Sequence, residues 1–167
     1  MRKLSILIFA LLGVIIVSCN SKTEEAIEYH DSIIIEHIAI QHKFDSLDAS
    51  FVNYNPDEMQ TSWQEAKEQT ELSIKTVKEL GDFDGKDKFQ KSALEFFELY
   101  NIVLNNYYSK MIDIYSIPDE EYTESDEAHF AELNDSMRNI YFPAFEAFKA
   151  DQLKFADEYG FEIIEKE

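Results

Sequence analysis

The chain has 167 residues, with 34 Asp and Glu against 15 Lys and Arg, a net charge of −19, and a single cysteine. One cysteine excludes an intramolecular disulfide framework and any multi-cysteine zinc or iron–sulfur site. The acidic balance argues against a nucleic-acid partner, because phosphate contacts need a basic patch. Four Gly and three Pro argue against a turn-rich all-β fold, and the length favours one domain.

The first 18 residues have the pattern of an export signal. Arg2 and Lys3 precede an apolar run over residues 4–17. This run is shorter than the roughly 20 apolar residues that a membrane-spanning helix needs. It ends in Ile16-Val17-Ser18-Cys19, which resembles the lipobox of bacterial lipoproteins.

The lipobox resemblance implies where the protein is located in the cell. It implies cleavage between Ser18 and Cys19, acylation of Cys19, export by the general secretory route and anchoring in the cell envelope through acyl chains, with the outer membrane favoured. The predicted organisation is a signal peptide over 1–18, a lipidated cysteine and polar tether over 19–25, and a helical domain over 26–167. Loss of Arg2 and Lys3 leaves 13 basic against 34 acidic residues, or −21. The alternative is an incidental Cys19 in an uncleaved anchor.

Two amphipathic helices are predicted in the first half of the domain. The first covers about 24–51, and its apolar seam advances in alternating steps of three and four residues. Its members are Ala26, His30, Ile33, His37, Ile40, Phe44, Leu47 and Phe51, widened by Ile27, Ile34, Ile38 and Gln41. Asn55 is a predicted N-cap and Pro56 the first residue of a second helix, which ends near Leu80 before Gly81.

Two further helices are predicted in the second half. The third covers about 86–114 and has two apolar stripes, so it should contact two neighbours. The fourth starts near Thr123, where Thr-Glu-Ser-Asp resembles a capping box, and ends before Gly160. Pro143 is expected to kink or split it. Four such helices with short loops predict an all-α, antiparallel up-down-up-down four-helix bundle. A two-helix hairpin that dimerises is the alternative.

The side chains that could form an interior polar or ligand-binding site are His30, His37, Gln41, Tyr100 and Tyr107. His30 and His37 are seven residues apart on one helix face, about 10.5 Å along the axis. This separation is too long for both to bind one metal, and no Glu-x-x-His motif of a di-iron bundle occurs. We expect no metal and no cofactor. The alternative for both histidines is a hydrogen-bonded place in the core.

The acidic segment from Asp82 to Asp87 superficially resembles a calcium loop. It departs from the EF-hand pattern, because Lys86 interrupts it and Ala93 stands at the twelfth position. The favoured interpretation is a helix end at Gly81 followed by an N-cap at Asp84. No nucleophile–base motif, phosphate loop or dinucleotide fingerprint occurs, which favours a protein that is not an enzyme.

With these features, the chain resembles small helical surface lipoproteins of unknown function from Gram-negative bacteria. Besides the lipobox, the likeness lies in Tyr29-His30-Asp31-Ser32-Ile33-Ile34, Phe83-x-Gly85…Phe89…Tyr100 and Phe155-Ala156-x-x-Tyr159-Gly160-Phe161. The resemblance implies an anchored helical domain. The expected function is a lipid-anchored envelope module that binds a protein or an envelope component. The alternative is a bundle that binds a small ligand or metal through His30, His37 and the tyrosines of the third helix.

Overall fold

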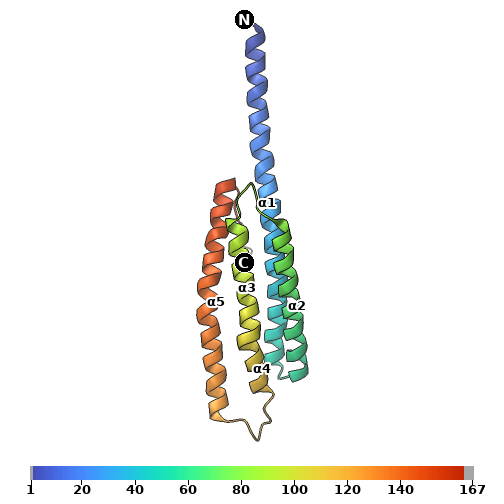
Figure 1. Ribbon diagram of the computed structural model, residues 1–167, viewed down its shortest axis with the longest axis vertical. Coiled ribbons are helices and arrows are strands. Elements are labelled where there is room, and N and C mark those ends of the chain that lie inside the picture. Colours follow the sequence, from blue (N-terminus) through green and yellow to red (C-terminus); the bar gives the residue numbers. More distant parts are fainter. Residues whose placement is uncertain (1, 164–167) are drawn as a thin grey trace.

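The computed structural model describes the backbone of residues 2–163 and the side chains of residues 21–163. This part of the chain is helical and contains no β-strand (Figure 1). The elements are α1 (Arg2–Val52), α2 (Pro56–Leu80), α3 (Lys88–Val103), the π-helical turn η1 (Leu104–Tyr108), α4 (Ser109–Tyr115) and α5 (Glu124–Tyr159). Because α3, η1 and α4 follow one another without a break, they act as one long helix.

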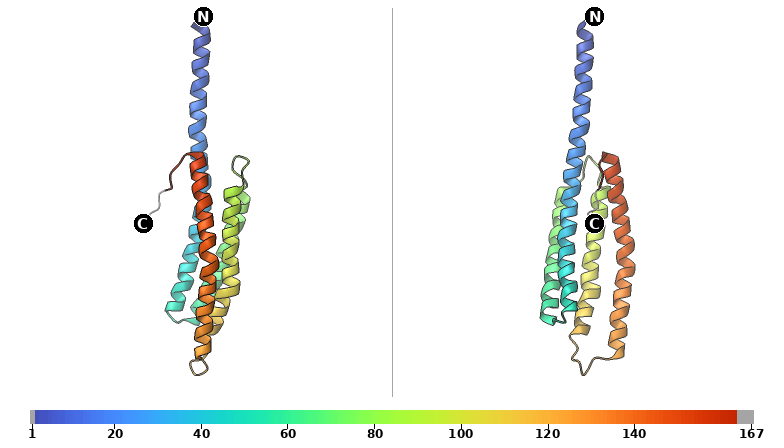
Figure 2. Two further views of the ribbon diagram at one scale, coloured as in Figure 1. Left: turned by 90° about the vertical axis from the view of Figure 1, so that its left-hand side faces the viewer. Right: turned by 180° about the vertical axis from the view of Figure 1, so that it is seen from behind.

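The four long helices pack antiparallel, which confirms the predicted bundle. α1 packs on α2, α2 on α3, and α3 on α5, while α5 also contacts α1 (Figure 2). The N-terminal part of α1 extends beyond the other three helices, and α5 ends on the side of the bundle where α1 enters (Figure 1). No helix among the described side chains, residues 21–163, is long and apolar enough to cross a membrane.

Three predicted helix ends are confirmed. Asn55 Oδ1 accepts the backbone N–H of Glu58 at 3.3 Å, as an N-cap should. Thr123 and Asp126 form a reciprocal capping box, in which Asp126 Oδ2 accepts the Thr123 N–H at 2.9 Å. Gly160 ends α5 in the left-handed region, with φ of 72°.

The connection between α2 and α3 differs from the prediction that Asp84 is an N-cap. Asp84 and Gly85 both have positive φ, 57° and 73°, and form the centre of a tight turn. Phe83 and Lys86 exchange two backbone hydrogen bonds of 3.0 Å across it. An Asp-Gly pair favours this kind of turn, so Asp84 is part of the turn and does not cap α3. Asp87 therefore takes the N-cap position, and α3 starts two residues later than predicted.

The core consists of two clusters along the bundle axis. Near the end where α1 enters, buried side chains include Ile33, Ile40, Val77, Phe96, Phe97 and Phe148. Toward the other end they include Leu47, Met59, Ala66, Leu104, Met111 and Leu133. Most of these residues lie on the predicted apolar faces, so hydrophobic burial fixes which side of each helix faces inward.

Pro143 does not split α5, which runs without interruption from Glu124 to Tyr159. Proline has no N–H to donate to the carbonyl four residues earlier, here that of Asn139. Both residues are exposed, so water can reach the unused carbonyl. The helix continues because its two halves are packed on the same neighbours through Leu133, Phe148 and Phe155.

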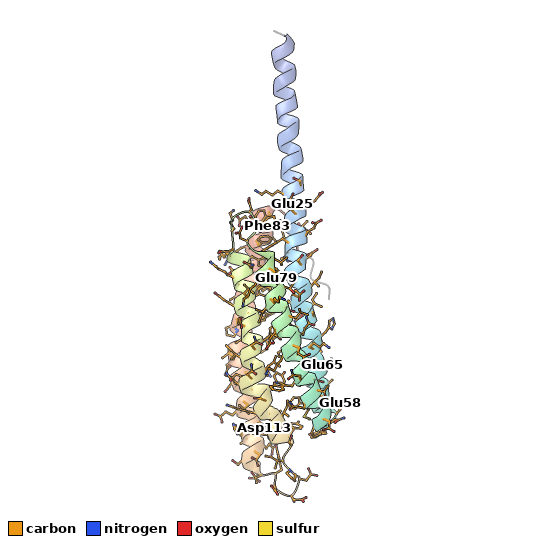
Figure 3. The ribbon with its side chains drawn as sticks, turned by 45° about the vertical axis from the view of Figure 1, so that its right-hand side comes forward. Glu25, Glu58, Glu65, Glu79, Phe83 and Asp113 are labelled. Atoms are coloured by element: carbon orange, nitrogen blue, oxygen red, sulfur yellow. The ribbon has the colours of Figure 1, made fainter. Side chains whose placement is uncertain are left out.

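The first residues whose side chains are described already contact the rest of the bundle. Residues 21–25, expected to belong to a polar tether, continue α1. Lys22 Nζ lies 2.6 Å from Asp84 Oδ2, and Thr23 Oγ1 donates to the Tyr159 carbonyl at 2.9 Å. Figure 3 shows Glu25 at this end of the bundle, together with Phe83. Ser18 and Cys19 lie outside the residues whose side chains are described.

Candidate ligand pocket

His30 occupies a buried position that other side chains satisfy. Gln152 Nε2 of α5 donates to His30 Nε2 at 2.9 Å, and His30 Nδ1 lies 2.9 Å from Asp31 Oδ1. The ring stacks on Phe89, and Phe161 of the C-terminal tail meets it edge-on. Both ring nitrogens are therefore in use, as in the predicted alternative of a core histidine.

His37 lies deeper, among aromatic rings. Phe96, Phe97 and Phe148 surround it with centroid distances of 5.4–6.0 Å. Its Nε2 lies 3.0 Å from the Tyr100 hydroxyl. Removal from water disfavours the charged imidazolium and lowers the pKa of His37 to about 4, so the ring is neutral at neutral pH.

Tyr100 connects this histidine to the edge of the core. Its hydroxyl lies 3.0 Å from His37 Nε2 and 3.3 Å from the Tyr141 hydroxyl of α5. Only 2 % of Tyr100 is exposed, and burial raises the pKa of its phenol well above the ordinary value. Tyr100 therefore stays protonated, and its hydroxyl joins the interior to a pocket between α1 and α5.

The π-helical turn η1 decides which tyrosines share the face of Tyr100. In a regular α-helix the residue seven positions later, Tyr107, would lie nearly above it. The extra residue of η1 shifts this register, so that Tyr108 is buried and Tyr107 is only partly buried. Trp63 of α2 fixes the turn, because its indole N–H donates to the Leu104 carbonyl at 2.8 Å.

The α1–α5 pocket has a volume of about 400 Å³ and is lined by three helices. This volume lies in the range of small-molecule sites. α1 contributes Ile38, Gln41, His42, Phe44, Asp45 and Asp48; α3 and η1 contribute Tyr100, Val103 and Tyr108; α5 contributes Met137, Arg138, Tyr141 and Phe142. Ile38 and Phe142, which are 43 % and 50 % exposed, place apolar side chains at the mouth.

One wall of the pocket carries a short hydrogen bond between a phenol and a carboxylate. The Tyr108 hydroxyl donates to Asp48 Oδ1 at 2.6 Å. Loss of hydration raises the pKa of Asp48, and the negative charge of Asp45 raises it further. The hydrogen bond from Tyr108 acts in the opposite direction, but the pKa of Asp48 remains raised overall. Burial and the neighbouring carboxylate raise the pKa of Tyr108 strongly, so the phenol remains a donor.

The pocket includes two of the five side chains predicted for an interior site. Gln41 and Tyr100 line it, His37 contacts it through Tyr100, and His30 lies outside it. Tyr107 does not line it, because η1 puts Tyr108 in its place.

The carboxylates of the pocket were missed although the sequence contains a signal for them. Ile38, Gln41, Asp45 and Asp48 continue one stripe of α1 in steps of three, four and three residues. Such spacing places them on one face beside the apolar seam. Asp45 and Asp48 therefore line the pocket while they remain exposed to solvent.

The described side chains, residues 21–163, contain no group of three His, Cys, Asp or Glu that could hold a metal ion. The α1–α5 pocket is lined by rings, hydroxyls and carboxylates. Comparison of the chain with protein-family models, curated proteins and solved structures finds no match.

Proposed function

We propose that the protein is a lipid-anchored domain of the bacterial cell envelope that binds a small organic ligand in the α1–α5 pocket. The observation that carries this proposal is the pocket itself, about 400 Å³ in volume, lined by five Phe and Tyr rings and by polar groups from three helices. Its walls are held in place by the hydrogen bonds of Tyr100 and Tyr108.

The envelope part of the proposal is supported by the sequence. Cys19 ends a short apolar export segment, and acyl chains on it would anchor the domain. Cleavage before Cys19 removes a stretch of α1 that extends beyond the other helices, so the four-helix body stays whole (Figure 1). The broader expectation, binding of a protein or envelope component, stays a prediction, as does the absence of enzymatic activity.

The anchor has its own test. Cys19→Ala removes the acceptor of the acyl chains, so the variant should leave the membrane fraction, whereas Ser21→Ala, two residues later, should stay with it. Retention of Cys19→Ala in the membrane fraction would contradict the anchor.

Ligand binding is tested by filling the pocket. The probes are three water-soluble aromatic fragments, 2-phenylethanol, 2-phenylethylammonium and 3-phenylpropionate, added to the processed protein in phosphatidylcholine nanodiscs. The readout is the NMR signal of the Met137 methyl group, which lines the pocket, with Met59 and Met111 as internal references in the core. At least one fragment should shift the Met137 signal with saturation.

The matched variants change two exposed isoleucines of α1. Ile38→Trp places a larger side chain in the pocket mouth and should abolish the Met137 response. Ile35→Trp, at a position that is 63 % exposed and does not line the pocket, should leave the response unchanged. If no fragment shifts Met137, or if Ile38→Trp and Ile35→Trp behave alike, the ligand-binding proposal is wrong.

A further inference from the structure

Among the residues that the structure describes, the two carboxylates of the α1–α5 pocket have no cationic partner. Among the described residues, neither Asp45 nor Asp48 forms an ion pair with a Lys, Arg or His side chain, although eight lysine–carboxylate pairs form elsewhere. Asp48 is held by Tyr108, a neutral donor, which orients the carboxylate without neutralising it. The negative charge is therefore available to a ligand.

Aromatic rings line the same pocket as these carboxylates. The Phe44 ring lies 4.7 Å from that of Tyr100 and 5.6 Å from that of Tyr108, while the Tyr141 ring lies 5.9 Å from Tyr100. The faces of such rings carry negative potential and attract ammonium groups, most strongly where water is partly removed. The rings and the carboxylates thus both favour a positively charged ligand.

The cationic side chain of the pocket lies at its edge. The Arg138 guanidinium is positioned over the Phe142 ring, 5.5 Å from its centroid. Phe142 is half exposed, so this pair belongs to the mouth. His42 is exposed as well. Asp45 and Asp48 are exposed too, and among the described residues neither Arg138 nor His42 forms an ion pair with them.

We propose that the α1–α5 pocket selects an organic cation, an ammonium group on an apolar body. The ammonium would lie between Asp45, Asp48 and the rings of Phe44 and Tyr108, and the apolar body would contact Val103 and Met137. This inference rests on the proposed function, because it names the class of ligand for the same pocket.

The three aromatic fragments test the selection by charge, because they have similar size and differ in the group at the end of the chain. In the Met137 titration, 2-phenylethylammonium should bind about tenfold or more tightly than 2-phenylethanol, and 3-phenylpropionate should bind more weakly still. A response of Met137 to all three with similar affinity, or a preference for the alcohol or the carboxylate, overturns the cation inference and leaves the ligand-binding proposal intact. A response to none overturns both.

A charge-matched pair of variants separates the pocket from the general field of an acidic protein. Asp48→Asn keeps an oxygen that can accept the hydrogen bond from the Tyr108 hydroxyl. It should weaken the binding of 2-phenylethylammonium about fivefold or more, without weakening the binding of 2-phenylethanol. Asp113→Asn removes the same charge from an exposed position of α4 outside the pocket (Figure 3) and should change either affinity by less than about twofold, because salt screens distant charges. Equal effects of Asp48→Asn and Asp113→Asn would show a bulk charge effect and overturn the inference.

Discussion

Acidification should destabilise the bundle through His37. This side chain is 6 % exposed, and desolvation lowers its pKa from 6.5 to about 4. The unfolded chain therefore binds a proton on His37 in a pH range where the folded chain does not. The stability that depends on the neutral ring is fully present above pH 6.5 and is lost progressively as the pH falls toward about 4.

The size of the effect follows from the two pKa values. A difference of about 2.5 units corresponds to roughly 3 kcal/mol over the whole window, and about 2 kcal/mol of this is lost between about pH 7.5 and about pH 5. His37→Gln removes the titrating group and keeps a polar partner for the Tyr100 hydroxyl. The other three histidines and the carboxylates titrate in both proteins, so the difference between the proteins isolates His37.

Urea unfolding followed by circular dichroism measures this difference on the processed chain. The free energy of unfolding of the wild type should fall by about 2 kcal/mol more than that of His37→Gln between the two pH values. An equal fall in both proteins would refute the reasoning, because it would mean that the folded state protonates His37 as readily as the unfolded chain does.

Two further predictions concern the last helix. Thr123→Ala removes the side-chain part of the capping box with Asp126 and should lower the free energy of unfolding by about 1 kcal/mol, whereas Ser125→Ala, in the same helical turn, should leave it nearly unchanged; equal losses would contradict the cap. Pro143→Ala supplies the N–H that the Asn139 carbonyl lacks and should raise the melting temperature and stabilise the protein by about 2 kcal/mol. A loss of stability in Pro143→Ala would show that the ring, although exposed, contributes packing.

The fold could be predicted because its determinants are local. A helix N-terminus leaves donors that a side chain such as Asn55 or Thr123 can satisfy, and Gly160 can adopt the left-handed conformation that ends a helix. The prediction of an N-cap at Asp84 was wrong for an equally local reason. The Asp84-Gly85 pair favours a tight turn with two positive φ angles, and this preference outweighs the capping tendency of aspartate.

The register of the third helix could not be predicted from periodicity. Tyr107 and Tyr108 are adjacent and chemically identical, so either could face inward. The choice depends on the π-helical turn, which a residue far away in the sequence supports: the Trp63 indole binds the Leu104 carbonyl from the neighbouring helix. A tertiary hydrogen bond therefore decides which phenol reaches Asp48, and pattern analysis of one helix does not contain that information.

The two histidines show why a conspicuous residue need not line the pocket. Their seven-residue spacing places both on the inner seam of α1, where a polar ring needs a partner from another helix. His30 obtains one from Gln152 of α5, whereas His37 lies beside Tyr100 of α3. The phenol of Tyr100 is thereby held between His37 and Tyr141, so that its ring forms a fixed wall of the pocket. His37 thus acts on the candidate site through Tyr100, and the α1 side chains that line the pocket lie on the adjacent stripe, at Gln41, Asp45 and Asp48 among others.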